Sequence, residues 1–280
     1  MARLPKNEEV GSKQFADFDL GGKTFIVTGG ARGLGLALAE GLVEAGGRVY
    51  CIDIAEEPDE EWKVAQKRVN PAWGGRLEYR QQDVCDTENL SRIIEETADE
   101  NQQLNGVIAA AGVNQVTPAI EYSAQDASKL LAINLTAVLE TASSAAKMMI
   151  KYKCGGSICL IASMSGLVAN KGMKSPVYNA SKAALIQLAK NLAMEWSLPK
   201  DESTPGIRVN CISPGHIITP MVEENFRQQP ELKDLWRKEN MMGRLARPDE
   251  FKGAALFLLS NASSFMTGSN IVIDGGHTAW

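Results

Sequence analysis

The sequence contains few of the residues from which metal centres and disulfide frameworks are built. It has only two histidines, far apart in the chain, and its cysteines show no CxxC spacing, so we expect no metal site. Five cysteines in 280 residues are also too sparse for a disulfide-rich secreted scaffold. We therefore expect buried thiols in a reducing compartment, at Cys51, Cys85, Cys154, Cys159 and Cys211.

Long apolar runs and basic blocks are also absent. No apolar run approaches the roughly 20 residues that span a bilayer, and the polar start MARLPKNEEVGSKQFADF has no apolar core of a secretion signal. A net charge of -5 without a basic block argues against nucleic acid or an anionic membrane as the main partner. We expect a cytoplasmic protein that acts on a small molecule.

The pattern of apolar residues indicates the fold class. The chain is 44% apolar and 22% charged, which suffices for a substantial core. Short runs rich in Val and Ile alternate with amphipathic stretches, which is typical of βαβ units around a parallel sheet buried on both faces. We expect an α/β fold: a single Rossmann-type domain whose doubly wound, seven-stranded parallel sheet has helices on both faces. The seven expected strands lie at 24–29, 48–53, 77–84, 105–112, 156–163, 207–215 and 270–276.

Two segments fall outside this alternation. Residues 1–20 are expected to form an extension, either flexible or docked on a neighbour, before the domain of residues 21–280. Residues 219–248 mix Met, Phe and Trp with charges, and we expect one or two mobile helices outside the sheet there. Their apolar residues are interpreted either as ordinary core contacts or as a lid over the substrate.

The segment TGGARGLG indicates a dinucleotide site. It follows the strand TFIV and opens a helix, which is the context that a glycine-rich phosphate loop requires. Gly29, Gly33 and Gly35 permit a tight turn, close approach of the backbone to a pyrophosphate and close helix packing. Leu34 lies between the last two glycines and is included in this site.

Two residues give opposite indications about the cofactor. Asp53 ends the second strand, where a carboxylate accepts hydrogen bonds from the adenosine ribose and repels a 2′-phosphate, and this favours NAD. Arg32 lies inside the glycine loop and can pair with a 2′-phosphate, which favours NADP. We expect Asp53 to dominate, because it occupies the place of the phosphate while Arg32 can swing into solvent. NAD(H) is the predicted cofactor and NADP(H) is the alternative.

Further cofactor contacts are expected at the ends of the next strands. Asp83 is expected to end a strand where an acid can reach the adenine amino group, and small residues at the end of the following strand let a ribose lie against the backbone. A structural role is the competing interpretation for Asp83 and for the small residues. The expected cofactor contacts also include Ile54 after Asp53, Val84 after Asp83, and the small residues Ala110, Ala111 and Gly112.

The segment PVYNASKAAL indicates proton transfer. Tyr178 and Lys182 are four residues apart in a stretch with helical spacing, so they share one helix face. A phenol has an ordinary pKa of about 10, and a cation held nearby favours the phenolate and brings that pKa toward the working range. We expect this pair to move a proton to or from a carbonyl oxygen.

With these residues in place, the chain resembles the short-chain dehydrogenase/reductase family from Lys23 to Trp280. The motifs TGGARGLG, AAAG, AINLTA, IASMSG, YNASK, SPGHIITP and MTGSNIVIDGG stand in the family's order. The resemblance implies a catalytic tetrad of Asn134, a serine of IASMSG, Tyr178 and Lys182. It also implies that the segment after the sixth strand flanks the cofactor, through Pro214, Gly215, Ile217 and Thr219. One departure is the triple alanine before Gly112, where the family usually has two asparagines, and this puts local rigidity in doubt.

The catalytic serine has two candidates. Counting 13 residues back from Tyr178, a common family spacing, reaches Ser165, whereas counting along the strand from Gly156 reaches Ser163. We choose Ser163, because sheet geometry fixes the end of the strand while the following loop can absorb extra residues. Ser165 is then expected to line the substrate pocket, with Asn114 and His216. For His216, a solvated loop position is the favoured interpretation and substrate contact is the alternative.

Within the family, the chain looks like the polyol and ketose branch, typified by D-arabinitol 2-dehydrogenase and the sorbose or xylulose reductases. We therefore expect an NAD(H)-dependent dehydrogenase of a secondary alcohol, with a polyol and its ketose as substrates. A reductase of a bulkier ketone, such as a 3-oxoacyl thioester or a secondary metabolite, is one alternative. A regulator that senses the dinucleotide without turnover is another. The resemblance also implies a homodimer or homotetramer that uses the helix of Tyr178, and Trp280 is expected to pack on a neighbour.

Overall fold

A computed structural model describes residues 15–199, 201 and 203–280. Seven parallel strands form one sheet in the order β3-β2-β1-β4-β5-β6-β7, which confirms the predicted architecture. The chain runs outward from β1 to β3 and then returns to the other side of β1, so the order reverses between β1 and β4. The strands are β1 (Thr24–Thr28), β2 (Arg48–Asp53), β3 (Arg76–Gln81), β4 (Gly106–Ala109), β5 (Gly156–Ile161), β6 (Ile207–Pro214) and β7 (Asn270–Ile273).

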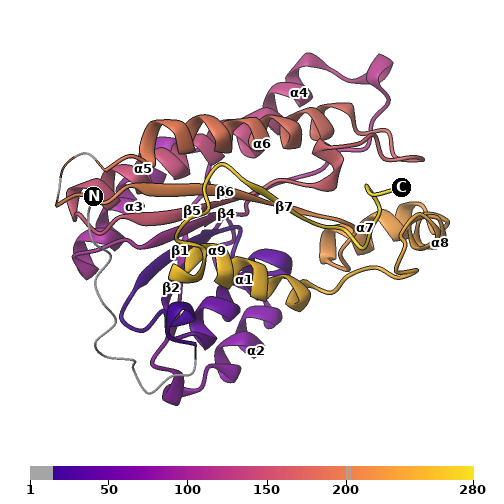
Figure 1. Ribbon diagram of the computed structural model, residues 1–280. Coiled ribbons are helices and arrows are strands. Elements are labelled where there is room, and N and C mark those ends of the chain that lie inside the picture. Colours follow the sequence, from indigo (N-terminus) through magenta and orange to yellow (C-terminus); the bar gives the residue numbers. More distant parts are fainter. Residues whose placement is uncertain (1–14, 200, 202) are drawn as a thin grey trace.

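Helices cover both faces of this sheet (Figure 1). On one face α3, α5 and α6 pack against the central strands, and on the other α1, α2 and α9 enclose a second apolar core. The central strands are buried on both faces, as their near-continuous apolar sequences require. The helices are α1 (Gly33–Glu44), α2 (Glu60–Arg68), α3 (Thr87–Asn101), α4 (Ala124–Leu131), α5 (Ala137–Lys151), α6 (Pro176–Trp196), α7 (Pro220–Gln228), α8 (Leu232–Lys238) and α9 (Lys252–Leu259).

Local sequence signals explain where several helices begin. The Asp59 side chain accepts hydrogen bonds from the backbone N–H groups of Glu61 and Trp62, and so caps α2. Asp86 caps α3 in the same way. Pro176 stands at the first position of α6, where its missing N–H would have no helical partner. These caps determine where α2 and α6 begin, and both helices carry side chains of the candidate site.

The segment predicted to lie outside the sheet forms two helices, α7 and α8, at one end of the molecule near the carboxyl terminus (Figure 1). Leu232 and Trp236 of α8 are buried with Leu245 in a small apolar cluster separate from the two main cores. Most of the predicted extension, residues 1–14, lies outside the described residues. Leu20, at its end, is fully buried, and its N–H donates to the Ala45 carbonyl.

Several predicted strands extend beyond the observed ones: β4, β5 and β7 end two or three residues before the expected positions. We also expected the third strand to reach Asp83 and Val84, but β3 ends at Gln81. The Asp83 carboxylate instead accepts a hydrogen bond from the backbone N–H of Cys85, and this turn directs the chain into α3. None of the helices in the described part of the chain has the length and apolarity that a membrane crossing requires.

Candidate active site

The candidate residues lie at the carboxyl-terminal ends of the strands. In an open parallel sheet, ligands bind at this edge, beside the point where the strand order reverses. The glycine loop follows β1, Asp53 ends β2, and Ala110 follows β4. Ser163 follows β5 and Pro214 ends β6, so five neighbouring strands contribute to one edge.

The glycine loop is shaped by close backbone contacts. Gly29 has a φ of +67°, and a Cβ on it would lie 2.8 Å from the Ala111 Cα. A Cβ on Gly35 would lie 2.0 Å from the Gly29 carbonyl oxygen, so neither position accepts a side chain. The first turn of α1 therefore opens directly onto the loop, and its N–H groups form a site for an anion. This backbone cradle fits the pyrophosphate of a dinucleotide.

Two carboxylates hold N–H groups of this loop. The Asp53 carboxylate accepts hydrogen bonds from Ala31 at 3.1 Å and from Ile54 at 2.8 Å. The Glu61 carboxylate, from α2, accepts a hydrogen bond from the Gly33 N–H at 3.1 Å. Burial raises the pKa of the Glu61 carboxyl, and the bond from Gly33 partly offsets that rise.

Glu61 was not among the predicted site residues. Nothing in its helical sequence context marks it, because it reaches the loop only through the packing of α2 against α1. Three other residues predicted to contact the cofactor differ in their exposure to solvent. The Arg32 side chain is exposed, Ile54 is 62% exposed directly after β2, and Val84 is buried.

Tyr178 and Lys182 lie on α6 with Ser163 close by. The Lys182 ammonium group lies 5.7 Å from the centre of the Tyr178 ring and donates a hydrogen bond to the Ile161 carbonyl at 2.8 Å. Ser163 and Lys182 are buried and Tyr178 is half-buried, and the Ser163 hydroxyl lies close enough to Tyr178 to influence the pKa of its phenol. The structure thus brings together three of the four predicted tetrad residues.

The electrostatics of this group differ from the expectation. Burial raises the pKa of Tyr178 above its ordinary value, and the nearby Ser163 hydroxyl only partly opposes this. Burial also lowers the pKa of Lys182 to about 8. The expectation that Lys182 brings the phenol pKa down is therefore wrong for the protein alone, because desolvation of the phenol outweighs the effect of a cation directed at the Ile161 carbonyl.

The two candidate serines have different partners. The Ser163 hydroxyl accepts a hydrogen bond from the Ser165 N–H at 3.1 Å, and it lies close enough to Tyr178 to oppose the rise in the pKa of that phenol. The Ser165 hydroxyl accepts a hydrogen bond from the Asn170 amide at 2.6 Å and lies in the short helical turn after β5. The geometry therefore favours Ser163 as the serine that acts with Tyr178.

Asn134 lies in a π-helical turn, Ala132–Thr136, between α4 and α5. Its side-chain amide accepts a hydrogen bond from the Val113 N–H and donates to the Val113 carbonyl, both at 2.9 Å, and it also donates to the Ser181 hydroxyl. A Cβ on Gly112 would lie within 3.5 Å of both the Asn134 and Lys182 side chains. Asn134 thus ties the segment after β4 to α6, beside Lys182.

The segment after β6 returns to the glycine loop. A Cβ on Gly215 would lie 2.6 Å from the Asp274 Cα, so this glycine permits a close backbone crossing. Ile217 forms a β-bridge with Ala246. A Cβ on Gly33 would lie 3.8 Å from the Thr219 Cβ, which places Thr219 against the phosphate loop. This contact links the start of α7 to the expected cofactor position.

The favoured interpretation of His216 as a solvated loop residue is wrong. His216 is 8% exposed, and its ring lies 3.9 Å from that of Trp236 and 5.4 Å from that of His277. Burial lowers the pKa of His216 to about 3. The apolar packing of α8 covers this histidine, and nothing in the SPGHIITP segment itself revealed that cover.

Asn114 borders the same region. Its amide group contacts the Met173 sulfur at 4.0 Å, and Met173 packs against the cluster of Leu232, Trp236 and Leu245. The Asn114 and Asn170 side-chain oxygens and the His216 Nε2 atom are buried without hydrogen-bond partners within the described residues. Buried polar atoms are normally paired, so these atoms are candidates for contact with a polar ligand.

Comparison with known proteins gives consistent matches over nearly the whole chain. A family model described as enoyl-(acyl carrier protein) reductase matches residues 29–278. A protein of Aspergillus versicolor named short chain dehydrogenases/reductase notP′ is 38% identical over 264 residues, which cover 94% of this chain and 89% of that protein. Galactitol 2-dehydrogenase of Rhizobium johnstonii is 35% identical over 267 residues, with 94% and 98% covered. NADH-dependent L-xylulose reductase of Ambrosiozyma monospora is 33% identical over 271 residues, with 94% and 97% covered.

Solved structures agree with these relatives. A short-chain type dehydrogenase/reductase from Mycobacterium marinum superposes with a TM-score of 0.85 at 32% identity, covering 95% of this chain and 99% of that one. A gluconate 5-dehydrogenase from Burkholderia cenocepacia, in complex with NADP and tartrate, superposes with a TM-score of 0.83 at 28% identity, covering 96% and 100%.

Proposed function

Because the chain belongs to the short-chain dehydrogenase/reductase family, we propose that it interconverts a polyol and the corresponding ketose, with NAD(H) as its preferred cofactor. Membership in this family makes the protein an NAD(P)-dependent oxidoreductase of secondary alcohols and ketones. The observation that carries the proposal is the half-buried Tyr178 between the buried Ser163 and Lys182 side chains, at the same sheet edge as the glycine loop.

The bound nicotinamide supplies a hydride to the ketone or accepts one from the alcohol. Each of the four tetrad residues then has a role that follows from its position. The Ser163 hydroxyl donates a hydrogen bond to the substrate oxygen and stabilises the charge that develops there. The Tyr178 hydroxyl gives this oxygen its proton in the reductive direction and removes it in the oxidative direction.

Lys182 and Asn134 support these two residues. The Lys182 ammonium group lies 5.7 Å from the centre of the Tyr178 ring and is available to the ribose hydroxyl groups of the cofactor. Asn134 forms hydrogen bonds with the backbone of Val113 and with the hydroxyl of Ser181, one residue before Lys182. These bonds hold the segment after β4 beside the Lys182 ammonium group. We assign it the role of anchoring a proton path from Lys182 toward solvent.

A polyhydroxylated substrate suits the polar atoms near this site. The unpartnered oxygens of Asn114 and Asn170 and the Nε2 atom of His216 accept hydrogen bonds, and hydroxyl groups donate them. Galactitol 2-dehydrogenase and L-xylulose reductase are relatives at 35% and 33% identity, and their names specify a polyol and a ketose. We assign Asn114, Ser165 and His216 to the substrate side on these grounds.

A second candidate is the reduction of a bulkier ketone. The cluster of Leu232, Trp236 and Leu245 supplies an apolar wall, and the matching family model is described as enoyl-(acyl carrier protein) reductase, a name that specifies an acyl thioester. A panel of pentitols, hexitols, ketoses and 3-oxoacyl thioesters, each assayed with both cofactors, separates the two. Turnover of the thioester alone would overturn the polyol proposal, and absence of any turnover would favour a dinucleotide-sensing regulator.

The NAD(H) preference rests on Asp53. Its carboxylate already holds the Ala31 N–H beside Arg32, and it would repel a 2′-phosphate at this position. The other cofactor contacts that we propose on this side come from the glycine loop and from the ends of neighbouring strands. They are Arg32, Leu34, Gly35, Ile54, Asp83, Val84, Ala110, Ala111 and Gly112. In the same panel, a higher kcat/KM with NADPH than with NADH would contradict the preference.

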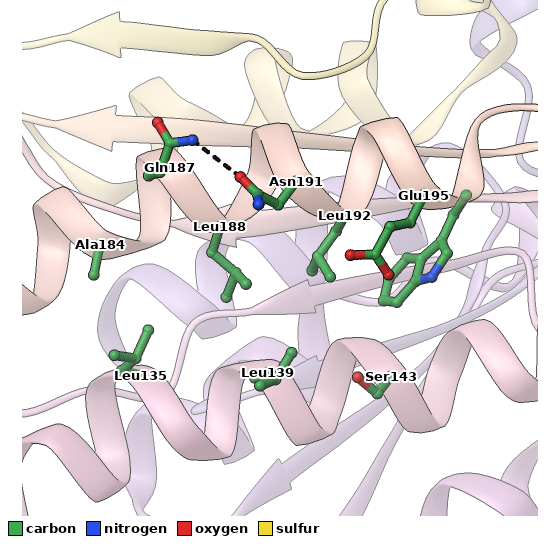
Figure 2. Close-up of a pocket in the computed structure, with 10 residues that line it drawn as sticks. Leu135, Leu139, Ser143, Ala184, Gln187, Leu188, Asn191, Leu192 and Glu195 are labelled. Atoms are coloured by element: carbon green, nitrogen blue, oxygen red, sulfur yellow. Dashed lines mark hydrogen bonds between the residues drawn. The ribbon is translucent and has the colours of Figure 1, made fainter.

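A groove between α5 and α6 supports assembly into a homodimer or homotetramer (Figure 2). Leu139 of α5 and Leu135 of the π-helical turn before it face Leu188 and Leu192 of α6 across the groove. Trp196, at the end of α6, also lines it. A second copy of the chain would bury this apolar surface. Light scattering of Leu188→Glu should show a smaller assembly than Lys147→Glu, an exposed change elsewhere on α5. A wild-type protein that is monomeric at micromolar concentration would contradict this proposal.

The site of action that we propose is the cytoplasm. All five cysteines are free thiols in the structure, which suits a reducing compartment. Cys51, Cys159 and Cys211 are buried as expected, whereas Cys154 is half-buried and Cys85 is exposed. Fractionation of cells that produce the protein would test this, and recovery in a membrane or secreted fraction would contradict it.

A further inference from the structure

Arg32 is flanked by two backbone N–H groups that both donate to carboxylates. On one side the Ala31 N–H donates to Asp53, and on the other the Gly33 N–H donates to Glu61, each at 3.1 Å. The two acids come from different elements, β2 and α2, and converge on one arginine of the phosphate loop. Asp53 was expected from its strand-end position, whereas Glu61 has no role in the function proposed above.

We propose that Glu61 is a second determinant of cofactor choice, which excludes a 2′-phosphate from the Arg32 side of the adenosine site. The inference rests on the proposed NAD(H)-dependent function. A phosphate bound to Arg32 would draw further hydrogen bonds from the N–H groups of Ala31 and Gly33. Because both donors already serve carboxylates, such a phosphate would have to displace two negative charges or lie beside them.

Glu61 also acts on Arg32 itself. Burial raises the pKa of the Glu61 carboxyl, and the charge of Arg32 is one of the smaller influences that oppose this rise, so an ionised Glu61 and Arg32 attract each other. This attraction reduces the positive potential that a 2′-phosphate would meet. It explains how a loop that contains an arginine, a residue suited to NADP, can belong to an enzyme that prefers NAD(H).

A purely structural role for Glu61 would be to cap the N-terminus of α1 through the Gly33 N–H. The variant Glu61→Gln separates the two roles, because a glutamine oxygen still accepts this hydrogen bond while the negative charge is lost. Glu60→Gln is the matched control. Glu60 is the preceding residue of α2, its side chain is 73% exposed and pairs with Lys63, and the change removes the same charge.

The experiment measures equilibrium binding of NADH and NADPH by nucleotide fluorescence, without turnover. In Glu61→Gln the dissociation constant for NADPH should fall about tenfold relative to that for NADH. In Glu60→Gln the ratio of the two constants should stay within about twofold of the wild-type value. Adding Arg32→Ser to Glu61→Gln should abolish the gain, while Arg32→Ser alone should change NADPH binding little.

Salt provides a measurement on the wild-type protein that needs no variant. Repulsion by Glu61 is screened at high ionic strength, so NADPH binding should improve relative to NADH binding as salt rises. An unchanged cofactor ratio in a folded Glu61→Gln protein, or an equal shift in Glu60→Gln, would overturn the role of Glu61 and leave the proposed function intact. A wild-type protein that binds neither nucleotide would overturn both.

Discussion

The two halves of the candidate site consist of different chemical groups. Beside β1 and β2, backbone N–H groups form the cradle, and the charged side chains Asp53, Glu61 and Arg32 stand around it within reach of solvent. Beside β5 and α6, the groups are the side chains of Ser163, Tyr178 and Lys182, and burial shifts the pKa values of the latter two.

This difference shows how one sheet edge serves two tasks. In the first half, the proposed discrimination between cofactors depends on the sign of charges that hydrogen bonds to the loop hold in place. In the second half, the proposed proton transfer depends on desolvation, which raises the pKa of Tyr178 and lowers that of Lys182 to about 8. The charge of Lys182 is therefore lost as the pH rises through about 8. A substitution in one half should leave the task of the other half intact.

The largest expected effect separates chemistry from cofactor binding. Tyr178→Phe removes the proton donor while keeping the ring, so kcat should fall by about 10²- to 10⁴-fold. The dissociation constant for NADH, measured by fluorescence, should stay within about threefold, because the phosphate loop is untouched. Turnover at the wild-type rate would remove Tyr178 from the mechanism, and a matching loss of NADH affinity would break the division into two halves.

A smaller expected effect on kcat distinguishes the two candidate serines in the half of the site beside β5 and α6. Ser163→Ala should lower kcat about 100-fold, because a hydrogen-bond donor to the developing oxyanion is lost. Ser165→Ala should change kcat by less than about threefold and act mainly on KM, since Ser165 bonds to Asn170 rather than Tyr178. Steady-state kinetics on the preferred polyol decide between them, and the reverse pattern would make Ser165 the catalytic serine.

The smallest expected effect concerns the free energy of unfolding rather than turnover. It tests whether burial under α8 also shifts the pKa of His216. The pKa of His216 is about 6.5 when unfolded and about 3 when folded. The unfolded chain therefore binds the extra proton first, and the stability gained from a neutral His216 is lost as the pH falls from 6.5 toward 3. At pH 5 this amounts to about 2 kcal/mol.

The variant His216→Phe keeps a ring against Trp236 but cannot take up a proton. Chemical unfolding at pH 7.5 and pH 5 should therefore show a smaller acid loss of stability in this variant than in the wild type. Equal losses in the two proteins would mean that His216 is solvated, and would contradict the packing of α8 over it.

Much of the fold was predictable because its signals are local. Each strand is a short apolar run between amphipathic stretches, and all seven expected strands occur in a single parallel sheet. The boundary of β3 was missed because Asp83 bonds to the Cys85 N–H, an interaction that strand periodicity does not reveal. The i, i+4 spacing of Tyr178 and Lys182 and the strand-end position of Asp53 also follow from short-range periodicity.

The sequence by itself determined the α/β class, the glycine loop and the shared helix face of Tyr178 and Lys182, because each depends on neighbours within a few positions. Only the tertiary structure brought Glu61 to the Gly33 N–H, placed Ser163 close to Tyr178 and covered His216 with Trp236. It also decided the direction of the Tyr178 pKa shift. These outcomes depend on packing between segments far apart in the chain and on the water that this packing removes, and no local pattern of residues records either.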